Sequence, residues 1–302
     1  MPSLPASRNP KAAARFAWLT LAFFILVVLW GAVVRATGSG GGCGSHWPLC
    51  NGDFFPHHPR LATIIEFAHR STSGICTVLD LALILWTFRA TQPGHRARKA
   101  ALWSAALLIM EALFGAVLVL FHYVDDNIST GRIVMQAIHF TNTLLLMAAL
   151  ALTAKFLMQK SASSKPASRS IALLAIITTT LVGATGALAA LADTLFPSPS
   201  LRAAIAADFA STSPLLVRMR WMHPAAAVLA LLCVALLIRI RTRSGRTLLA
   251  LIFLQFALGA ADILLLAPTW MQILHLLGAD IFWVALVLTA ADSLWPQRYP
   301  QK

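Results

Sequence analysis

The chain has 302 residues, of which 58% are hydrophobic and 12% are charged, and its mean hydropathy is +0.74. About a quarter of a typical soluble domain is charged, so this composition lacks the polar material to cover a water-facing surface. The net charge of +13 suits nucleic acid at first sight. The basic residues are confined mainly to alternate connections, however, and that distribution argues against nucleic acid as a partner.

Eight apolar segments follow one another along the chain, each long enough to cross about 30 Å of hydrocarbon. Their Ala- and Leu-rich runs favour helices over the alternating pattern of a transmembrane β-barrel. We predict an all-α, polytopic membrane protein with eight transmembrane helices arranged as two pseudo-symmetric four-helix bundles. The predicted spans are 16–34, 63–88, 101–121, 133–154, 171–191, 218–238, 247–267 and 270–291.

Every second connection is rich in Lys and Arg, and 17 of the 24 basic residues lie on one side of the predicted spans. By the positive-inside rule, that side is cytoplasmic. We therefore expect both termini on the cytoplasmic side of a bacterial-type cytoplasmic membrane. A basic region precedes the first span, as in a signal peptide. The span is long for a signal sequence and no convincing cleavage site follows it, so we expect an uncleaved first helix.

Short motifs recur in the same order in the two parts of the chain. "MQAIH" at 135–139 opens the fourth span and "MQILH" at 271–275 opens the eighth, while "EALFGA" at 111–116 recurs as "QFALGA" at 255–260. Four spans in each part predict parallel repeats related about the membrane normal. The predicted division is an N-terminal half at 1–158, a cytoplasmic linker at 159–170 and a C-terminal half at 171–302.

Four of the nine histidines lie inside predicted spans: His69, His139, His223 and His275. All four are on even-numbered spans, roughly 10 Å or less below the outer surface. A single intramembrane His commonly hydrogen-bonds a neighbouring helix. Four at one level, two in each half, favour imidazole ligands that clamp haem, His69 with His139 and His223 with His275. Two histidines alone are too few for an isolated transition-metal ion.

Arginines near the outer boundary are candidates for binding the two propionates of a haem. Arg35, Arg70 and Arg220 have the most suitable depth, and a guanidinium matches a carboxylate in geometry and charge. For any one of them, ordinary snorkelling to the membrane surface is an equally good explanation.

Glu66 precedes His69 by three residues, so both side chains project from one helical face. An intramembrane carboxylate is costly and usually serves a function, here proton transfer beside a haem. A salt bridge with Arg70 or Arg132 is the structural alternative. The matching position in the second half is Arg220. This asymmetry predicts that the first site performs chemistry and that the second holds a permanent cofactor.

Two cysteines lie seven residues apart in the first outer loop, "GSGGGCGSHWPLCNG". The loop faces an oxidising compartment, so we expect Cys43 and Cys50 to form a disulfide. A structural clip and a redox-active pair both remain open. Cys76 and Cys233 lie within spans and are expected to be small packing residues.

The segments "RATGSGGGCGSHWPLCNGDFFP", "IIEFAHRSTSG" and "AIHF" closely resemble the first half of the haem A synthase family, most specifically over 31–74. That family has eight helices in two halves and oxidises the ring methyl of haem O to a formyl group, giving haem A for terminal oxidases. The resemblance implies that His69 and His139 ligate the substrate haem O. It implies that His223 and His275 ligate haem b, which relays electrons. Glu66 matches a carboxylate needed for activity, and Cys43 and Cys50 match the loop cysteines.

The second half departs from the family pattern in two respects. The loop at 192–217 contains no cysteine, whereas many relatives carry a second pair there. Pro224 replaces the family's Arg after the third histidine and is expected to bend the sixth span. Both departures weaken the assignment of the second half more than that of the first.

Two other classes of function fit part of the sequence. A non-enzymatic di-haem b-type electron carrier would explain four histidines equally well, and a haem transporter or chaperone would need an exit path. Glu66 and the cysteine loop favour the enzyme, because electron transfer alone needs neither. The apolar spans imply membrane lipid as a partner, and the resemblance implies haem O synthase and an electron donor. A homo-oligomer is also compatible with the sequence.

Overall fold

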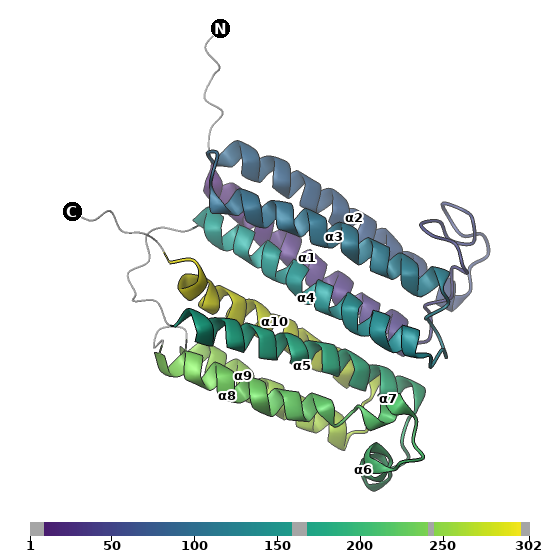
Figure 1. The fold of residues 1–302 in the computed structure, drawn as a ribbon. Coiled ribbons are helices and arrows are strands. Elements are labelled where there is room, and N and C mark those ends of the chain that lie inside the picture. Colours follow the sequence, from purple (N-terminus) through teal and green to yellow (C-terminus); the bar gives the residue numbers. More distant parts are fainter. Residues whose placement is uncertain (1–8, 159–167, 241–244, 297–302) are drawn as a thin grey trace.

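The computed structural model describes residues 9–158, 168–240 and 245–296 (Figure 1). Within these ranges the chain is mainly helical and has no β-strand, and eight helical segments are long and apolar enough to cross a membrane. The predicted all-α polytopic membrane fold is therefore confirmed. The helices are α1 (Pro10–Ala36), α2 (Leu61–Ala90), α3 (Arg96–Leu120), α4 (Thr130–Met158), α5 (Arg169–Leu195), α6 (Leu201–Phe209), α7 (Leu215–Arg218), α8 (Met222–Ile240), α9 (Gly245–Leu264) and α10 (Thr269–Leu294).

Polar residues define the starts of the first and third spans. The Asn9 side chain accepts a hydrogen bond from the Ala12 N–H and so caps α1. The α3 helix follows His95, whose Nδ1 accepts from the Ala97 N–H at 3.2 Å. Partial burial and the charge of Arg98 lower the pKa of His95. A neutral ring keeps a free nitrogen lone pair for this cap.

The sixth span is interrupted between α7 and α8. The Met222 N–H bonds to the Met219 carbonyl at 3.0 Å and the His223 N–H to the Arg220 carbonyl at 3.1 Å, the spacing of a tighter turn. Pro224 follows in the first turn of α8; it lacks an N–H and its ring crowds the carbonyl four residues earlier. The interruption lies one turn before Pro224, as these two properties of proline predict.

The first four helices, α1 to α4, contact one another, and so do α5, α8, α9 and α10 (Figure 1). The two sets meet where α1 and α4 contact α5 and α10. Trp283 of α10 is almost fully buried in this region, and its indole N–H donates to the Leu144 carbonyl of α4 at 2.7 Å. Leu146, Met147 and Leu237 are also buried in the shared apolar core.

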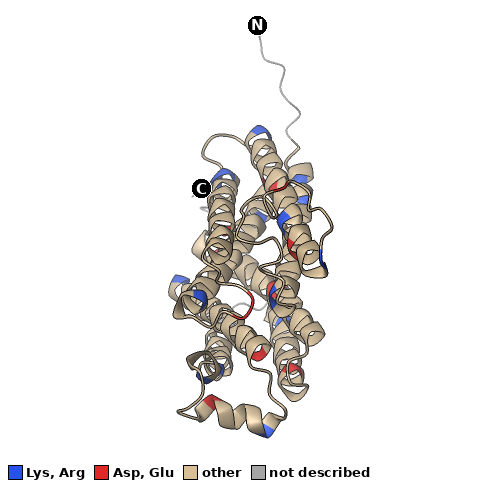
Figure 2. Cartoon of the chain, turned by 90° about the vertical axis from the view of Figure 1, so that its right-hand side faces the viewer, with Lys and Arg blue, Asp and Glu red and all other residues tan. Residues whose placement is uncertain are grey.

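The loop at 37–60 and the helices α6 and α7 lie at one end of the molecule (Figure 1). Figure 2 views the chain from that end, where blue and red segments both occur on a mainly tan ribbon. Seven arginines and seven acidic residues lie at this end of the molecule, so their formal charges cancel. Among the described residues, the positive excess therefore lies toward the opposite end, with basic residues such as Lys11, Arg96 and Lys99.

Candidate functional site

The four intramembrane histidines lie near one level, measured from the loop-bearing end of their helices. His69 is eight residues into α2, His139 nine into α4 and His275 six into α10. His223 is eight residues beyond Leu215, where the sixth span begins. At 1.5 Å per residue these depths are roughly 9 to 14 Å.

The second predicted histidine pair is formed by neighbours in space. The ring centroids of His223 and His275 are 6.2 Å apart, with their planes at 80°. Bonds between a metal and an imidazole nitrogen are about 2 Å long, so two imidazoles on opposite sides of one metal have ring centres about 6 Å apart. His69 and His139 lie at similar depth on α2 and α4, and their pairing stays a prediction. The spacing within the second pair suits two ligands that share one iron.

Glycines of adjacent helices face three of the four imidazoles. A Cβ added to Gly31 would lie 3.1 Å from Cε1 of His69, and one added to Gly259 would lie 3.2 Å from Cε1 of His275. The same atom on Gly186 would approach Cε1 of His223 to 2.9 Å. A larger residue at any of the three positions would collide with the ring itself, so these glycines let each imidazole lie against the backbone of the neighbouring helix.

The four histidines differ in the partner of one ring nitrogen. Nδ1 of His69, of His139 and of His275 is buried and has no hydrogen-bond partner among the described residues, whereas His223 Nδ1 lies 3.1 Å from the Val182 carbonyl. An imidazole that binds iron through Nε2 leaves Nδ1 free to donate a hydrogen bond, as the Nδ1 of His223 can do to Val182. The described residues contain no group of three or more metal-binding side chains. Two facing imidazoles are the protein ligands that haem needs, because the porphyrin supplies the other four donors to its iron.

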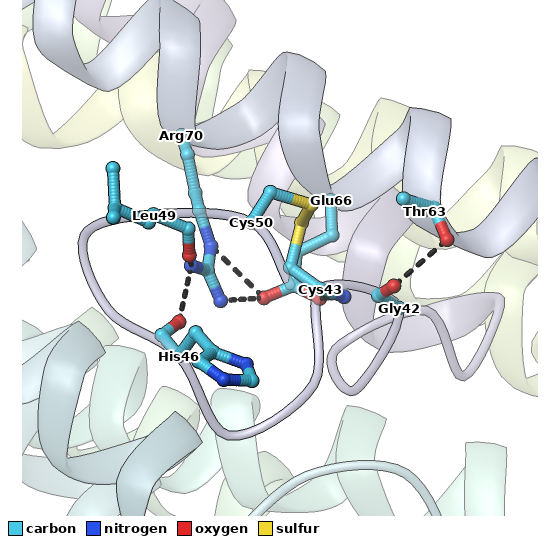
Figure 3. Close-up of a disulfide and its surroundings, with 8 residues drawn as sticks. All are labelled: Gly42, Cys43, His46, Leu49, Cys50, Thr63, Glu66 and Arg70. Carbon is cyan, nitrogen blue, oxygen red and sulfur yellow. Dashed lines mark hydrogen bonds and ion pairs between the residues drawn. A yellow bond between two sulfur atoms is a disulfide. The ribbon is translucent and has the colours of Figure 1, made fainter. Parts of the chain in front are cut away.

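Glu66 is tied to the outer loop. Its Oε2 accepts a hydrogen bond from the Cys43 N–H at 2.7 Å, and its Oε1 forms an ion pair with Arg70 (Figure 3). Arg70 also donates to the carbonyls of His46 and Leu49, at 2.6 and 2.7 Å. The Glu66 carboxylate is 3% exposed, and both of its oxygens are thus held in place. The structural alternative, a salt bridge with Arg70, is present.

The predicted disulfide between Cys43 and Cys50 is present and almost fully buried (Figure 3). The loop that contains it packs against the start of α2, where the Thr63 hydroxyl donates to the Gly42 carbonyl at 2.7 Å. A Cβ on Gly42 would lie 2.4 Å from the Ala62 carbonyl oxygen, so only glycine permits this close approach. The disulfide, the glycine and the Glu66 carboxylate therefore fix the loop on α2.

The other two candidate propionate ligands also have protein partners. Arg35 of α1 donates to the Ala190 carbonyl at 2.6 Å and to Gln272 at 2.7 Å, and it contacts the Thr194 hydroxyl. Arg220 forms ion pairs with the carboxylates of Asp193, at 2.9 Å, and Asp208, at 2.7 Å. These contacts hold each arginine in place near the outer end, Arg35 among uncharged partners and Arg220 between two carboxylates. Binding of a propionate by any of them stays a prediction.

Asp80 and Glu111 are carboxylates within the membrane helices that had no predicted role. Asp80 of α2 is 2% exposed and accepts a hydrogen bond from the Ser104 hydroxyl at 2.8 Å. Glu111 of α3 lies 3.6 Å from His139. In the sequence it stands out only as part of the repeated motif at 111–116. A general rule would have identified both residues, because an ionisable side chain within a membrane helix is a functional candidate by default.

The fold and these side chains define a polytopic helical membrane protein with four histidines inside the membrane and a disulfide-closed outer loop. The chain belongs to the COX15-CtaA family, described as cytochrome oxidase assembly protein, whose model matches residues 14–287.

Individual relatives match different shares of the chain. A protein of Thermus thermophilus named protoheme IX farnesyltransferase is 41% identical over 296 residues, which cover 93% of this chain and 48% of that protein. Haem A synthase of Bacillus licheniformis is 42% identical over 111 residues (37% of this chain, 36% of the relative). Haem A synthase of Bacillus pumilus is 37% identical over 155 residues (51% and 48%). The chain thus spans about half the length, or less, of these curated relatives.

Proposed function

We propose that this protein is an oxidoreductase of haem A synthesis, which converts the ring methyl of haem O to a formyl group. The product, haem A, would serve terminal oxidases. Support comes from the family, whose description is cytochrome oxidase assembly, and from relatives in Bacillus that are named haem A synthase. The buried carboxylate beside one histidine pair agrees with an enzyme better than with a pure electron carrier.

The observation that carries the proposal is the difference between the two histidine pairs. Glu66 lies one helical turn before His69 and is held by the Cys43 N–H and by Arg70. Arg220 has the corresponding place before His223 and pairs with two acidic residues. A fixed carboxylate can accept or hold a proton next to a reacting group, whereas a paired arginine cannot. The first pair is therefore the proposed reaction site.

The proposed roles follow from that difference. His69 and His139 ligate the iron of the substrate haem O, and Glu66 handles protons at its edge. His223 and His275 ligate haem b, which supplies one-electron transfer when bound. All four histidines are partly buried, and the glycines beside three of them let the rings lie close to the neighbouring helices. Arg35, Arg70 and Arg220 are the candidates for binding the propionates at the outer end. Arg35 has uncharged partners, whereas Arg70 and Arg220 already pair with carboxylates.

The two sets of four helices are proposed to be pseudo-symmetric halves, at 1–158 and 171–302. Each set contains one histidine pair, and the recurring motifs occur in the same order in both. The positive excess at the end opposite the 37–60 loop supports a cytoplasmic location for both termini. The outer loop with its disulfide would then face the oxidising side of a bacterial cytoplasmic membrane.

The Thermus relative supports a partner that supplies the substrate. Its name specifies farnesyl transfer to protohaem IX, and the part similar to this chain is about half of it. Haem O is the farnesylated form of protohaem. In Thermus, therefore, one polypeptide named as a farnesyltransferase also contains a region similar to this chain. We infer that a haem O synthase delivers substrate to this protein, and that an electron donor and membrane lipid complete the system.

The test is to produce the protein in cells that make haem O but no haem A, and to extract the haems from their membranes. Haem A is expected with the wild-type chain and should be missing from cells without it. A folded, haem-loaded protein that leaves only haem B and unchanged haem O would overturn the proposal.

A further inference from the structure

Glu111 of α3 approaches the ring of His139 on α4. Its Oε2 lies 3.6 Å from His139 Nδ1, and this carboxylate oxygen also accepts a hydrogen bond from the Asn142 amide at 2.6 Å. The other oxygen contacts the Thr143 hydroxyl. Its two α4 neighbours therefore hold the carboxylate beside a nitrogen that has no hydrogen-bond partner among the described residues. A separation of 3.6 Å is too long for a hydrogen bond, so the carboxylate and the ring are close neighbours that are not bonded to each other here.

His69, the other member of this pair, has no comparable support within the described structure. Its Nδ1 is buried without a partner there, and its ring packs against the Cα of Gly31. Glu66, three residues earlier on the same helix, has both oxygens engaged by Cys43 and Arg70. The two imidazoles of the first pair are thus held unequally.

The second pair has no carboxylate at the place of Glu111. The repeated motif puts Gln255 there, and the position three after the histidine is Gly278 instead of Asn142. The Gln255 amide nitrogen is buried without a partner in the described structure, and it fills the space that a Cβ on Gly278 would need. The carboxylate is therefore specific to the first pair.

We propose that Glu111 is a positioning residue that keeps His139 on the iron of the substrate haem, so that His69 is the ligand that leaves. A carboxylate that accepts from Nδ1–H fixes the tautomer of an imidazole, directs Nε2 at the metal and makes it a stronger electron donor. His69 would then be the exchangeable ligand, and it comes from α2, the helix that also carries Glu66. The assignment rests on the proposed function, because it names the substrate haem as the occupant of the first pair.

The first experiment compares Glu111→Gln with Asp80→Asn in the full-length, haem-loaded protein in lipid nanodiscs. Each variant removes one buried carboxylate from the first four helices, but Asp80 lies eleven residues beyond His69, about 16 Å along α2. Redox titration should resolve two haem transitions. In Glu111→Gln one transition should move to a more positive potential by about 59 mV, a tenfold change in the one-electron equilibrium, because the iron loses electron donation. Asp80→Asn should leave both unchanged.

The second experiment keeps the idea testable if Glu111→Gln fails to fold. His69→Ala should retain haem in the first pair as a five-coordinate, high-spin species, and added imidazole should restore the low-spin spectrum. His139→Ala should lower the haem content of that pair at least tenfold. The reverse pattern, or equal shifts in Glu111→Gln and Asp80→Asn, would overturn the assignment. These spectra need haem binding but no turnover, so a failure to form haem A overturns the function while leaving the ligand assignment intact.

Discussion

The guanidinium of Arg35 on α1 donates a hydrogen bond to the Gln272 side chain on α10 at 2.7 Å, across the boundary between the two sets of four helices. The same group donates to the Ala190 carbonyl of α5 at 2.6 Å. One side chain thus links the first helix to two helices of the second set. A charged hydrogen bond of this kind stabilises by about 1.5–3 kcal/mol, and more if its loss leaves a buried group unpaired.

Arg35→Ala should therefore lower the stability of the whole molecule. The expected loss is about 2–4 kcal/mol, seen as a fall of roughly 5–10 °C in the apparent unfolding temperature in detergent. Arg35→Lys should rescue only part of it, since a single ammonium cannot reproduce the planar fork. Arg202→Ala on the exposed face of α6 serves as the control and should change the transition little. Equal shifts in Arg35→Ala and Arg202→Ala would show that the link between the sets contributes nothing.

The buried disulfide should act as a structural clip. Cys43 is 0% exposed and Cys50 is 2% exposed, so reductants and thiol enzymes have little access to the sulfurs. The double variant Cys43→Ser, Cys50→Ser should lose about 2–3 kcal/mol of stability. Haem A formation should fall by less than about tenfold, since Thr63 and Arg70 still hold the loop. Complete loss of haem A formation in a folded double variant would favour a redox role.

Hydropathy alone predicted the membrane spans, because each covers an apolar run of the required length. The helices extend beyond those runs: α2 occupies Leu61–Ala90, where the prediction was 63–88, since helical hydrogen bonds continue into polar residues such as Arg89. The short helices α6 and α7 were not predicted. They have nine and four residues, too few to show a clear apolar period.

The site was predictable where a residue type carries the signal by itself. The disulfide is confirmed because two cysteines in one short outer loop have few other partners. The contact of Arg35 with Gln272 joins residues 237 positions apart, and the approach of Glu111 to His139 depends on how α3 lies against α4. The spacing of residues within one helix does not reveal which residues of another helix they will face, so neither contact could be predicted. Haem ligation by the paired histidines stays a prediction.

Substitution of Glu66 should separate chemistry from loop anchoring. Glu66→Gln can still accept the Cys43 N–H but loses the ion pair with Arg70 and the capacity to carry a proton. Haem content should be retained, and haem A formation should fall by about 10²- to 10⁴-fold, the usual contribution of general acid–base catalysis. The measurement is the ratio of haem A to haem O in membrane extracts.

Thr63→Val supplies the matched control for Glu66→Gln. It removes the hydrogen bond to the Gly42 carbonyl, which anchors the same loop without involving the carboxylate. Formation of haem A should remain within about tenfold of the wild type, because the net loss of one hydrogen bond is about 1 kcal/mol. If both variants lose activity equally, Glu66 acts as an anchor and not in the reaction.

Enlarging the glycines that face the imidazoles should exclude haem from one pair at a time. The Cβ of Gly186→Val would lie 2.9 Å from the His223 ring, closer than real Cβ contacts, so the ring would have to leave its present position. Haem bound by His223 and His275 should be lost while the first pair keeps its own, so the haem-to-protein ratio should fall by about half. Gly74→Ala is the control, because a Cβ there meets nothing within 4 Å. If Gly186→Val keeps the wild-type haem content and spectrum, haem binding does not depend on the position of the His223 ring, and the proposed second site is wrong.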